Sequence, residues 1–232
     1  MAAERNPITM KIAGVHTGPD LGSLCLRPEV VELLSETKEP RAFLEATLAQ
    51  QRYQDAFDFV THWFPKRQLI WWGCLCCWQG LRPRPSDQDA LALRAALQWV
   101  IHPGEETRRH AERAGYAADI VTPAGNLALA AYLTGGSMTP PGAPDVPPDP
   151  QLAGDTVANV VTLLLAKIPA AEQPAVQAQF VRIALDIVSG KLVWTRPRTD
   201  EPAPAPPMPE QEGKETDRSP QPSQEWTGTW TR

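Results

Sequence analysis

The most informative segment of the sequence is Pro65-Lys66-Arg67-Gln68-Leu69-Ile70-Trp71-Trp72-Gly73-Cys74-Leu75-Cys76-Cys77-Trp78. After its first turn it is apolar on every face, and a helix that is apolar all round is buried on every side. Gly73 costs such a helix about 1 kcal/mol relative to Ala, so we expect a neighbouring backbone to pack closely there. The residues expected to be largely buried are Trp71, Trp72, Cys74, Leu75 and Trp78.

The sequence on both sides of this segment has the period of amphipathic helices. Apolar residues recur at spacings of three and four, which places each set on one helical face. The sets are Tyr53, Phe57, Val60 and Phe64; Ala90, Leu93, Leu97 and Val100; Val157, Val161, Leu164 and Ile168; and Val176, Phe180, Ile183 and Ile187. No convincing strand is longer than residues 24–26 or 192–194. We expect about nine helices.

Signals for helix ends agree with this pattern. Proline fits the first turn of a helix, where a missing N–H costs nothing, and Ser and Thr side chains cap N-termini. Ser86 with Asp89 is typical of a capping box, and Thr122 precedes another expected helix. We expect Gly135 and Gly190 to end two helices in the left-handed conformation. The prolines at expected helix starts are Pro28, Pro40, Pro65, Pro103 and Pro123.

The predicted fold class is all-α, as an irregular helical bundle or short α-solenoid with a disordered C-terminal tail. Short helices joined by short connections favour antiparallel neighbours, which is the arrangement of both architectures. A repeat of fixed period is absent from the sequence, so the irregular bundle ranks ahead of the solenoid.

Proline also divides the chain into segments. There are 25 prolines in 232 residues, about twice the average usage. Eight of them lie in residues 196–232, whose composition cannot bury enough apolar surface to offset the entropy of ordering. Six more lie in residues 135–151, which we predict to be an extended strap between two helical blocks. The predicted organisation is a flexible N-terminus at 1–22, a helical domain at 23–195 that contains the strap, and a disordered tail at 196–232.

Charge and hydropathy exclude two classes of partner. The formal net charge is −5, so the chain has no long-range field that would gather phosphate backbones, and nucleic acid is not expected as a partner. Residues 1–11 lack the apolar core of a signal peptide. The apolar run at 69–78 is shorter than the roughly 20 residues that cross a bilayer, so we expect a cytoplasmic protein without membrane insertion.

The four cysteines are Cys25, Cys74, Cys76 and Cys77. The functional interpretation of the last three is a thiolate metal site or a reactive nucleophile, and the alternative is that they are small core residues. On a helix Cys74 and Cys77 share a face whereas Cys76 points elsewhere, and no second Cys pair completes four ligands. The pattern favours core packing, and we expect no bound metal or other cofactor.

A second metal hypothesis concerns His102, Glu106 and His110, which are spaced four residues apart. His102 and His110 would lie about 12 Å apart along one helix, and Pro103 begins a new helix between them. Residues 105–113 fit a solvated face better, because Glu105 to Arg109 is a stabilising spacing of opposite charges.

Sequence signatures of enzymes are missing from the chain. It has no Gly-rich phosphate loop, no Gly-x-Ser-x-Gly elbow and no His-Glu-x-x-His motif. None of its four histidines stands near a Ser or Cys in a recognisable catalytic context. We therefore expect no enzymatic activity and no catalytic residues.

The tail ends in a segment with aromatic anchors, at Trp226 and Trp230. A rigid ring on an otherwise solvated segment supplies a large contact area to a partner's pocket, which is how short motifs in disordered regions bind. The alternative is a terminus that docks back on its own domain. We predict that Trp226 and Trp230 contact a protein partner.

Several motifs together resemble an uncharacterised bacterial helical family whose genes stand beside type VI secretion effector genes. The similarity covers about residues 24–192 and leaves the tail out, and its motifs are typical of packing rather than of chemistry. They are Arg52-Tyr53-Gln54-Asp55-Ala56, Pro65-Lys66-Arg67, Trp71-Trp72-Gly73-Cys74, Trp99-Val100, Pro123-Ala124-Gly125, Gly135-Gly136-Ser137 and Pro140-Pro141.

The resemblance implies a cytoplasmic accessory protein that helps a secretion effector, or the dedicated chaperone of an effector, reach the spike tip of the secretion machine. On this interpretation the chain is an adaptor or co-chaperone that acts through protein contacts. Two alternatives stay open: a generic helical scaffold unrelated to secretion, and a Cys-dependent metalloprotein or enzyme that uses residues 74–77.

Overall fold

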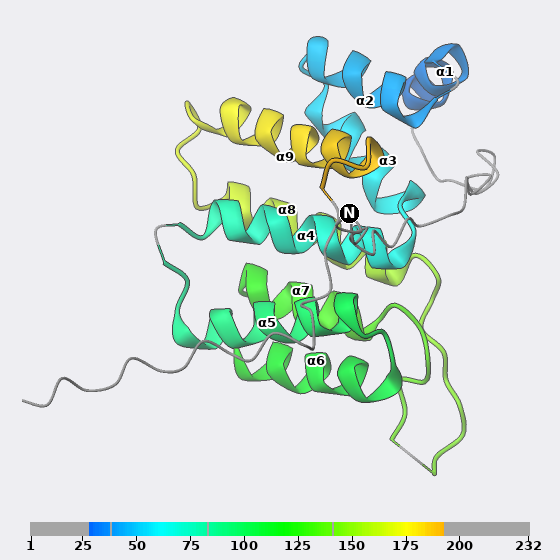
Figure 1. The fold of residues 1–232 in the computed structure, drawn as a ribbon, viewed down its shortest axis with the longest axis vertical. Coiled ribbons are helices and arrows are strands. Elements are labelled where there is room, and N and C mark those ends of the chain that lie inside the picture. Colours follow the sequence, from blue (N-terminus) through cyan, green and yellow to red (C-terminus); the bar gives the residue numbers. More distant parts are fainter. Residues whose placement is uncertain (1–27, 38, 83, 141, 193–232) are drawn as a thin grey trace, which may run out of the picture. The chain divides into compact units, whose positions relative to one another are not determined.

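The computed structural model describes residues 28–37, 39–82, 84–140 and 142–192. These residues form nine α-helices and no strand, which confirms the all-α prediction for this part of the chain (Figure 1). The predicted segments 1–22 and 196–232 lie outside the described residues. The helices are α1 (Pro28–Thr37), α2 (Pro40–Ala49), α3 (Tyr53–Trp63), α4 (Lys66–Gly80), α5 (Asp87–Ile101), α6 (Glu105–Ala117), α7 (Pro123–Tyr132), α8 (Leu152–Leu165) and α9 (Gln173–Val188).

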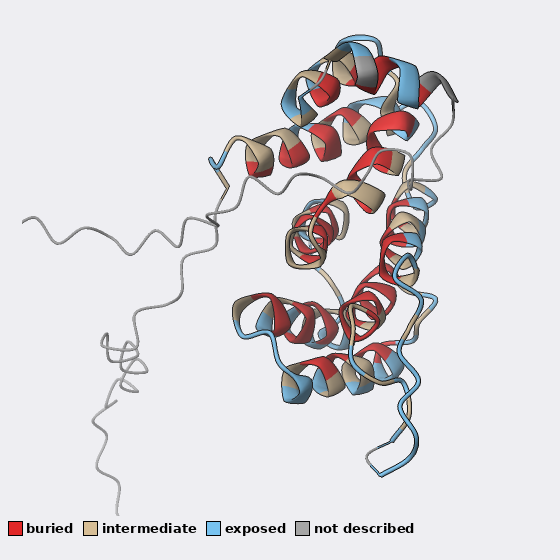
Figure 2. Cartoon of the chain, turned by 90° about the vertical axis from the view of Figure 1, so that its right-hand side faces the viewer, coloured by how far each residue is buried: buried red, intermediate tan, exposed pale blue. Residues whose placement is uncertain are grey.

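Helix α4 is surrounded by other helices, as its apolar sequence predicts. It packs against α5, α7, α8 and α9, and together with α8 it lies between the α5–α6–α7 group and the group formed by α9 with α2 and α3 (Figure 1). Figure 2 shows the buried residues on the facing sides of these helices. Within the described ranges, no helix combines the length and the apolarity that crossing a membrane requires.

Trp72 is the largest fully buried side chain of α4. Its indole N–H donates a 3.0 Å hydrogen bond to the carbonyl oxygen of Phe180 in α9, so the buried polar atom is satisfied. A Cβ added at Gly73 would lie 2.5 Å from Cδ1 of Leu127 in α7. The close neighbour expected at Gly73 is therefore present, and it is a side chain rather than a backbone.

The prediction of burial is wrong for Trp78. Trp72 and Cys74 are buried, Trp71 and Leu75 are half-buried, and Trp78 is 63% exposed. The physical reason is that an apolar helix is buried only as far as its neighbours extend, and Trp78 lies in the last turn of α4, just before the chain leaves the helix.

Most of the predicted helix ends are present. The hydroxyl oxygen of Ser86 accepts a hydrogen bond from the backbone N–H of Asp89, and that of Thr122 accepts one from Gly125. Gly190 follows α9 with φ +69°, in the left-handed region that favours glycine. The sequence-level capping signals thus identified the starts of α5 and α7 and the end of α9.

Arg108 explains why the glycine expected at the end of α7 is Gly136 rather than Gly135. Gly136 has φ +68°, and a Cβ there would lie 2.8 Å from Nε of Arg108. The Arg108 side chain is 4% exposed and donates to the carbonyl oxygens of Tyr132 (2.9 Å) and Ser137 (2.8 Å). The chain after α7 therefore bends around a guanidinium that belongs to α6.

The proline-rich strap predicted at 135–151 connects α7 to α8 and is tied down at both ends. Near its start, Nη2 of Arg109 donates to the carbonyl oxygens of Ser137 (2.8 Å) and Thr139 (2.5 Å). Near its end, Nζ of Lys66 donates to the carbonyl oxygen of Pro150. Most residues between these anchors are exposed. The strap is thus an exposed connection held by cations of α4 and α6.

The prediction that residues 105–113 form a solvated face is wrong at Arg108. The expected pair of Glu105 and Arg109 is present, with 2.9 Å between Oε1 and Nε. Arg108 instead points inward, because the carbonyl groups at the end of α7 and in the strap need donors and the guanidinium supplies several in one plane.

Candidate functional site

The cysteines of α4 are packing residues in this structure. Cys74, Cys76 and Cys77 are all buried, and the sulfur of Cys77 contacts the carbonyl oxygen of Pro123 at 3.8 Å. Burial raises the pKa of Cys74 to about 12 and raises the pKa values of Cys76 and Cys77 well above the ordinary thiol value. Because the nucleophile and metal ligand is the thiolate, neutral buried thiols suit packing better than chemistry.

The residues of the second metal hypothesis, His102, Glu106 and His110, do not form a metal-binding cluster in the described part of the chain. His102 follows α5 as its C-cap, whereas His110 lies within α6 at an exposed position. Nδ1 of His62 donates a 2.7 Å hydrogen bond to the carbonyl oxygen of Asp58 in its own helix. Across the described ranges, no three His, Cys, Asp or Glu side chains come together in a way that could hold a metal ion.

The charged cluster at the start of α6 is strongly coupled. Glu105 accepts two 2.7 Å hydrogen bonds from the guanidinium of Arg108 and one of 2.9 Å from Arg109. The hydrogen bond from Arg108 is the largest cause that lowers the pKa of Glu105 to about 2. The guanidinium carbons of Arg108 and Arg109 lie 4.6 and 5.3 Å from the ring centre of Tyr132. The groups of this cluster form hydrogen bonds with one another and with the strap, so the cluster anchors the strap to α6.

Large apolar side chains are exposed at one end of the α4–α5–α6 group. Trp78 is 63% exposed, Leu91 57%, Tyr116 60% and Val121 68%. Of the large apolar side chains exposed in the described residues, these four are the most exposed. We call this set of residues the apolar end.

The topology places the four residues of the apolar end at the same side of the body. Residues 81–86 join the last turn of α4 to the first turn of α5, and residues 102–104 join α5 to α6. Because α5 packs against both α4 and α6, these short connections make neighbouring helices antiparallel. The end of α4, the start of α5 and the end of α6 therefore lie at the same side of the body (Figure 1).

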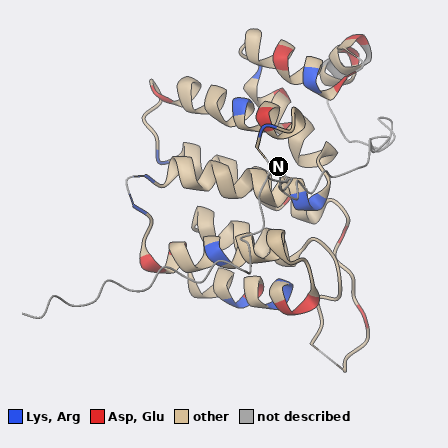
Figure 3. Ribbon diagram, in the orientation of Figure 1, with Lys and Arg blue, Asp and Glu red and all other residues tan. Residues whose placement is uncertain are grey.

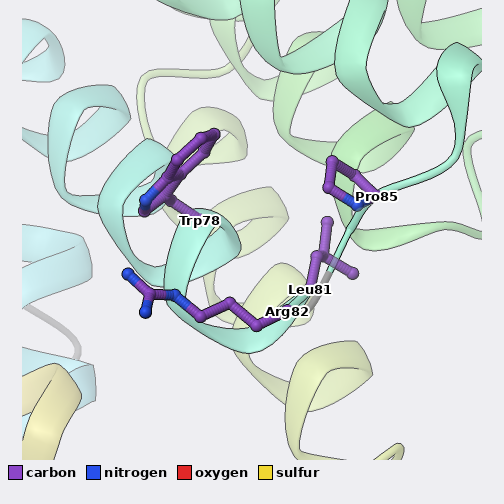
Figure 4. A pocket seen from close by; sticks show the side chains of 4 residues that line it. All are labelled: Trp78, Leu81, Arg82 and Pro85. Atoms are coloured by element: carbon purple, nitrogen blue, oxygen red, sulfur yellow. The ribbon is translucent and has the colours of Figure 1, made fainter.

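An open hollow lies beside Trp78 in the apolar end. It has a volume of about 570 Å³ and is lined by Trp78, Leu81, Arg82 and Pro85. Figure 4 shows Trp78 and Arg82 on one side of the opening and Leu81 and Pro85 on the other. The lining thus combines three apolar side chains with one guanidinium.

Arg82, which lines the hollow, and Arg84, which follows it on the same connection, form few polar contacts in the described part of the chain. Among the described residues, Arg82 has no hydrogen-bond or ion-pair partner. Arg84 approaches Asp87 at 3.8 Å, with side chains 85% and 96% exposed. An exposed ion pair of this kind contributes little to stability. Arg82, which is unpaired within the described ranges, and Arg84, which is weakly paired, are therefore both free to bind another molecule. Figure 3 shows basic positions in blue on the connection between α4 and α5.

The site predicted from sequence and the site seen in the structure are different. Trp226 and Trp230, the predicted partner-binding residues, lie outside the described residues. Sequence reasoning missed the apolar end, although two signals pointed to it. Leu91 falls outside the apolar stripe of its helix, and Tyr116 is a large aromatic residue in the otherwise polar helix α6.

The described residues define an all-α body with large apolar side chains exposed at one side of it. The chain belongs to the family of unknown function DUF6931, whose model matches residues 43–188. That span contains the whole apolar end and stops before the tail. No curated protein and no solved structure matches the chain.

Proposed function

We propose that this chain is a non-enzymatic accessory protein that binds another protein through the apolar end. The observation that carries the proposal is Trp78, which is 63% exposed at the end of a helix whose other tryptophans are buried or half-buried. Tyr116 and Leu91 lie at the same end of the body. Large exposed side chains such as these can serve as contacts at protein interaction surfaces, where Trp, Tyr and Arg dominate binding energies.

The proposed setting is type VI secretion in the bacterial cytoplasm, where the protein acts as an adaptor or co-chaperone in the loading of effectors. The support for this setting is the resemblance carried by motifs such as Trp71-Trp72-Gly73-Cys74. In this proposal Trp226 and Trp230 form a second contact with the partner. Two weak contacts on one chain raise the overall affinity when both can be made at once.

The raised pKa values of the buried cysteines support a non-enzymatic role. A catalytic or metal-binding cysteine needs a thiolate that a substrate or ion can reach. The motif residues of the resemblance also have structural partners: Arg67 donates to the carbonyl oxygens of Val100 and Ile101 at 2.6 and 3.1 Å. This contact caps the end of α5.

The test is affinity capture of the tagged full chain from the native bacterium, followed by identification of the captured proteins. We expect a secretion effector, an effector chaperone or a spike component, and we expect its recovery to fall when Trp78→Ala and Tyr116→Ala are combined. The matched control is Met138→Ala combined with Val146→Ala, because these residues are exposed apolar residues of the strap.

The outcomes separate the alternatives. Capture of unrelated proteins through the apolar end would favour a generic scaffold and remove the secretion setting. Equal capture by the parent and the Trp78/Tyr116 variant would remove the apolar end as the contact. Capture that falls only with Trp226→Ala and Trp230→Ala would assign the contact to the tail.

A further inference from the structure

The hollow beside Trp78 is lined by apolar side chains and one arginine, and this lining indicates which kind of group it can bind. Its apolar walls are Trp78, Leu81 and Pro85, and its volume of about 570 Å³ lies within the range of ligand pockets in proteins. Because the hollow is open to solvent, a side chain that projects from a partner surface can enter it without any movement of α4 or α5 (Figure 4).

Charge decides which kind of partner fits. Arg82 lines the hollow with donors that have no partner among the described residues, and Arg84 follows on the same connection. The nearby carboxyl groups do not pair with Arg82 in the described part of the chain: Oδ2 of Asp89 accepts a 2.8 Å hydrogen bond from the Ser86 hydroxyl, and Asp87 lies 3.8 Å from Arg84. Because Arg82 is exposed and has no partner within the described ranges, a carboxylate is the group that complements the charge of this site. A guanidinium binds a carboxylate through two parallel hydrogen bonds, which fixes the orientation of the partner.

We propose that the hollow binds a short acidic segment of the partner protein. A large apolar side chain of that segment sits between Trp78 and Pro85, and a carboxylate close to it in sequence pairs with Arg82. This inference rests on the proposed function and goes further, because it names the chemistry of the bound segment and the residue that selects it.

The test uses a random-peptide display library selected against the purified full chain. We expect enriched peptides to carry Asp or Glu within a few residues of Leu, Phe or Trp. For a synthetic enriched peptide, Arg82→Gln should weaken binding roughly tenfold, as expected for the loss of a charged hydrogen bond. Trp78→Ala should weaken it more, and the matched control Arg182→Gln, at an exposed position of α9, should leave it unchanged. Binding should also weaken as salt is raised.

Three results would overturn the inference. They are no enrichment above the bare-support control, enrichment of neutral or basic peptides, and equal affinity of the parent and Arg82→Gln. Arg82 is exposed, so its variant should fold, and the thermal melt of each variant verifies this. Peptides that depend on Trp78 but not on Arg82 would remove the acidic selectivity and leave the proposed function standing. The proposed function is tested separately, by capture of partners from the cell.

Discussion

At the scale of single residues, two tryptophans of α4 show how position along one helix sets their roles. Trp72 is fully buried and bonded to Phe180, whereas Trp78 is 63% exposed beside Arg82. Both stand in the same apolar run of sequence. Only the arrangement of neighbouring helices separates a core residue from a surface residue, and sequence pattern alone does not contain that arrangement.

We predict opposite stability effects for these two residues. Trp72→Ala removes a large core side chain and should lower the free energy of unfolding by about 3–5 kcal/mol. Trp78→Ala removes an exposed ring and should change it by less than about 0.5 kcal/mol. Denaturant unfolding of both variants measures this, and a large loss of stability for Trp78→Ala would show that the ring packs against the body.

The glycines of two helix contacts give a second prediction. A Cβ at Gly125 would collide with the backbone carbonyl of Asp119, which cannot move away, whereas a Cβ at Gly73 would meet the flexible end of Leu127. Gly125→Ala should therefore lower the melting temperature by several degrees more than Gly73→Ala, whose strain is partly offset by the better helix propensity of Ala. Equal melting temperatures would contradict the close approach at Gly125.

At the scale of elements, the apolar stripes and capping residues predicted the helices well, since both are local properties. Phe57, Val60 and Phe64 are buried as their spacing requires, and Ser86 caps α5. The anchoring of the strap could not be predicted, because Arg108 reaches carbonyl groups more than 20 residues away in the sequence. A charged helix is normally solvated, and only the tertiary fold turns this arginine inward.

The hydrogen bonds of Glu105 at the start of α6 predict that the stability of the protein depends on pH. The hydrogen bond from Arg108 lowers the pKa of Glu105 from 4.5 to about 2. The native state therefore holds this carboxylate ionised more strongly than the unfolded chain does. Its stabilisation is present above about pH 4.5 and is lost as the pH falls towards 2.

Melting temperatures between pH 7 and pH 3 measure this contribution. Glu105→Gln should melt below the parent at pH 7, and the two curves should converge as the pH falls. Glu106→Gln is the matched control, because Glu106 is an exposed neighbour in the same turn. If the melting temperatures of the parent and Glu105→Gln differ by the same amount at every pH, the ionised Glu105 carboxylate does not stabilise the fold.

At the scale of the whole molecule, the described body has an extensive apolar core of its own. Its buried apolar residues run from Val30 to Ile187. Since the proline-rich composition of 196–232 opposes a core, truncation after Thr195 should leave the melting temperature unchanged within error. Circular dichroism melts of both forms test this, and loss of cooperative unfolding on truncation would show that the tail packs.

The sequence indicates some candidate binding residues but does not indicate the apolar end. Trp226 and Trp230 were visible because they stand alone in a polar segment. The apolar end joins residues from α4, α5 and α6 together with Val121, which follows α6. Their common side of the body follows from two short connections and antiparallel packing, so it appears only after the helices are placed in space.

The central claim is that a protein partner covers Trp78, and hydroxyl-radical footprinting of the complex captured from the bacterium tests it most directly. Oxidation of Trp78 is compared between the free chain and the complex, with Met138 of the strap, 37% exposed, as the internal control. We predict that oxidation of Trp78 falls severalfold in the complex while oxidation of Met138 stays the same. Equal oxidation of Trp78 in both states would contradict the claim.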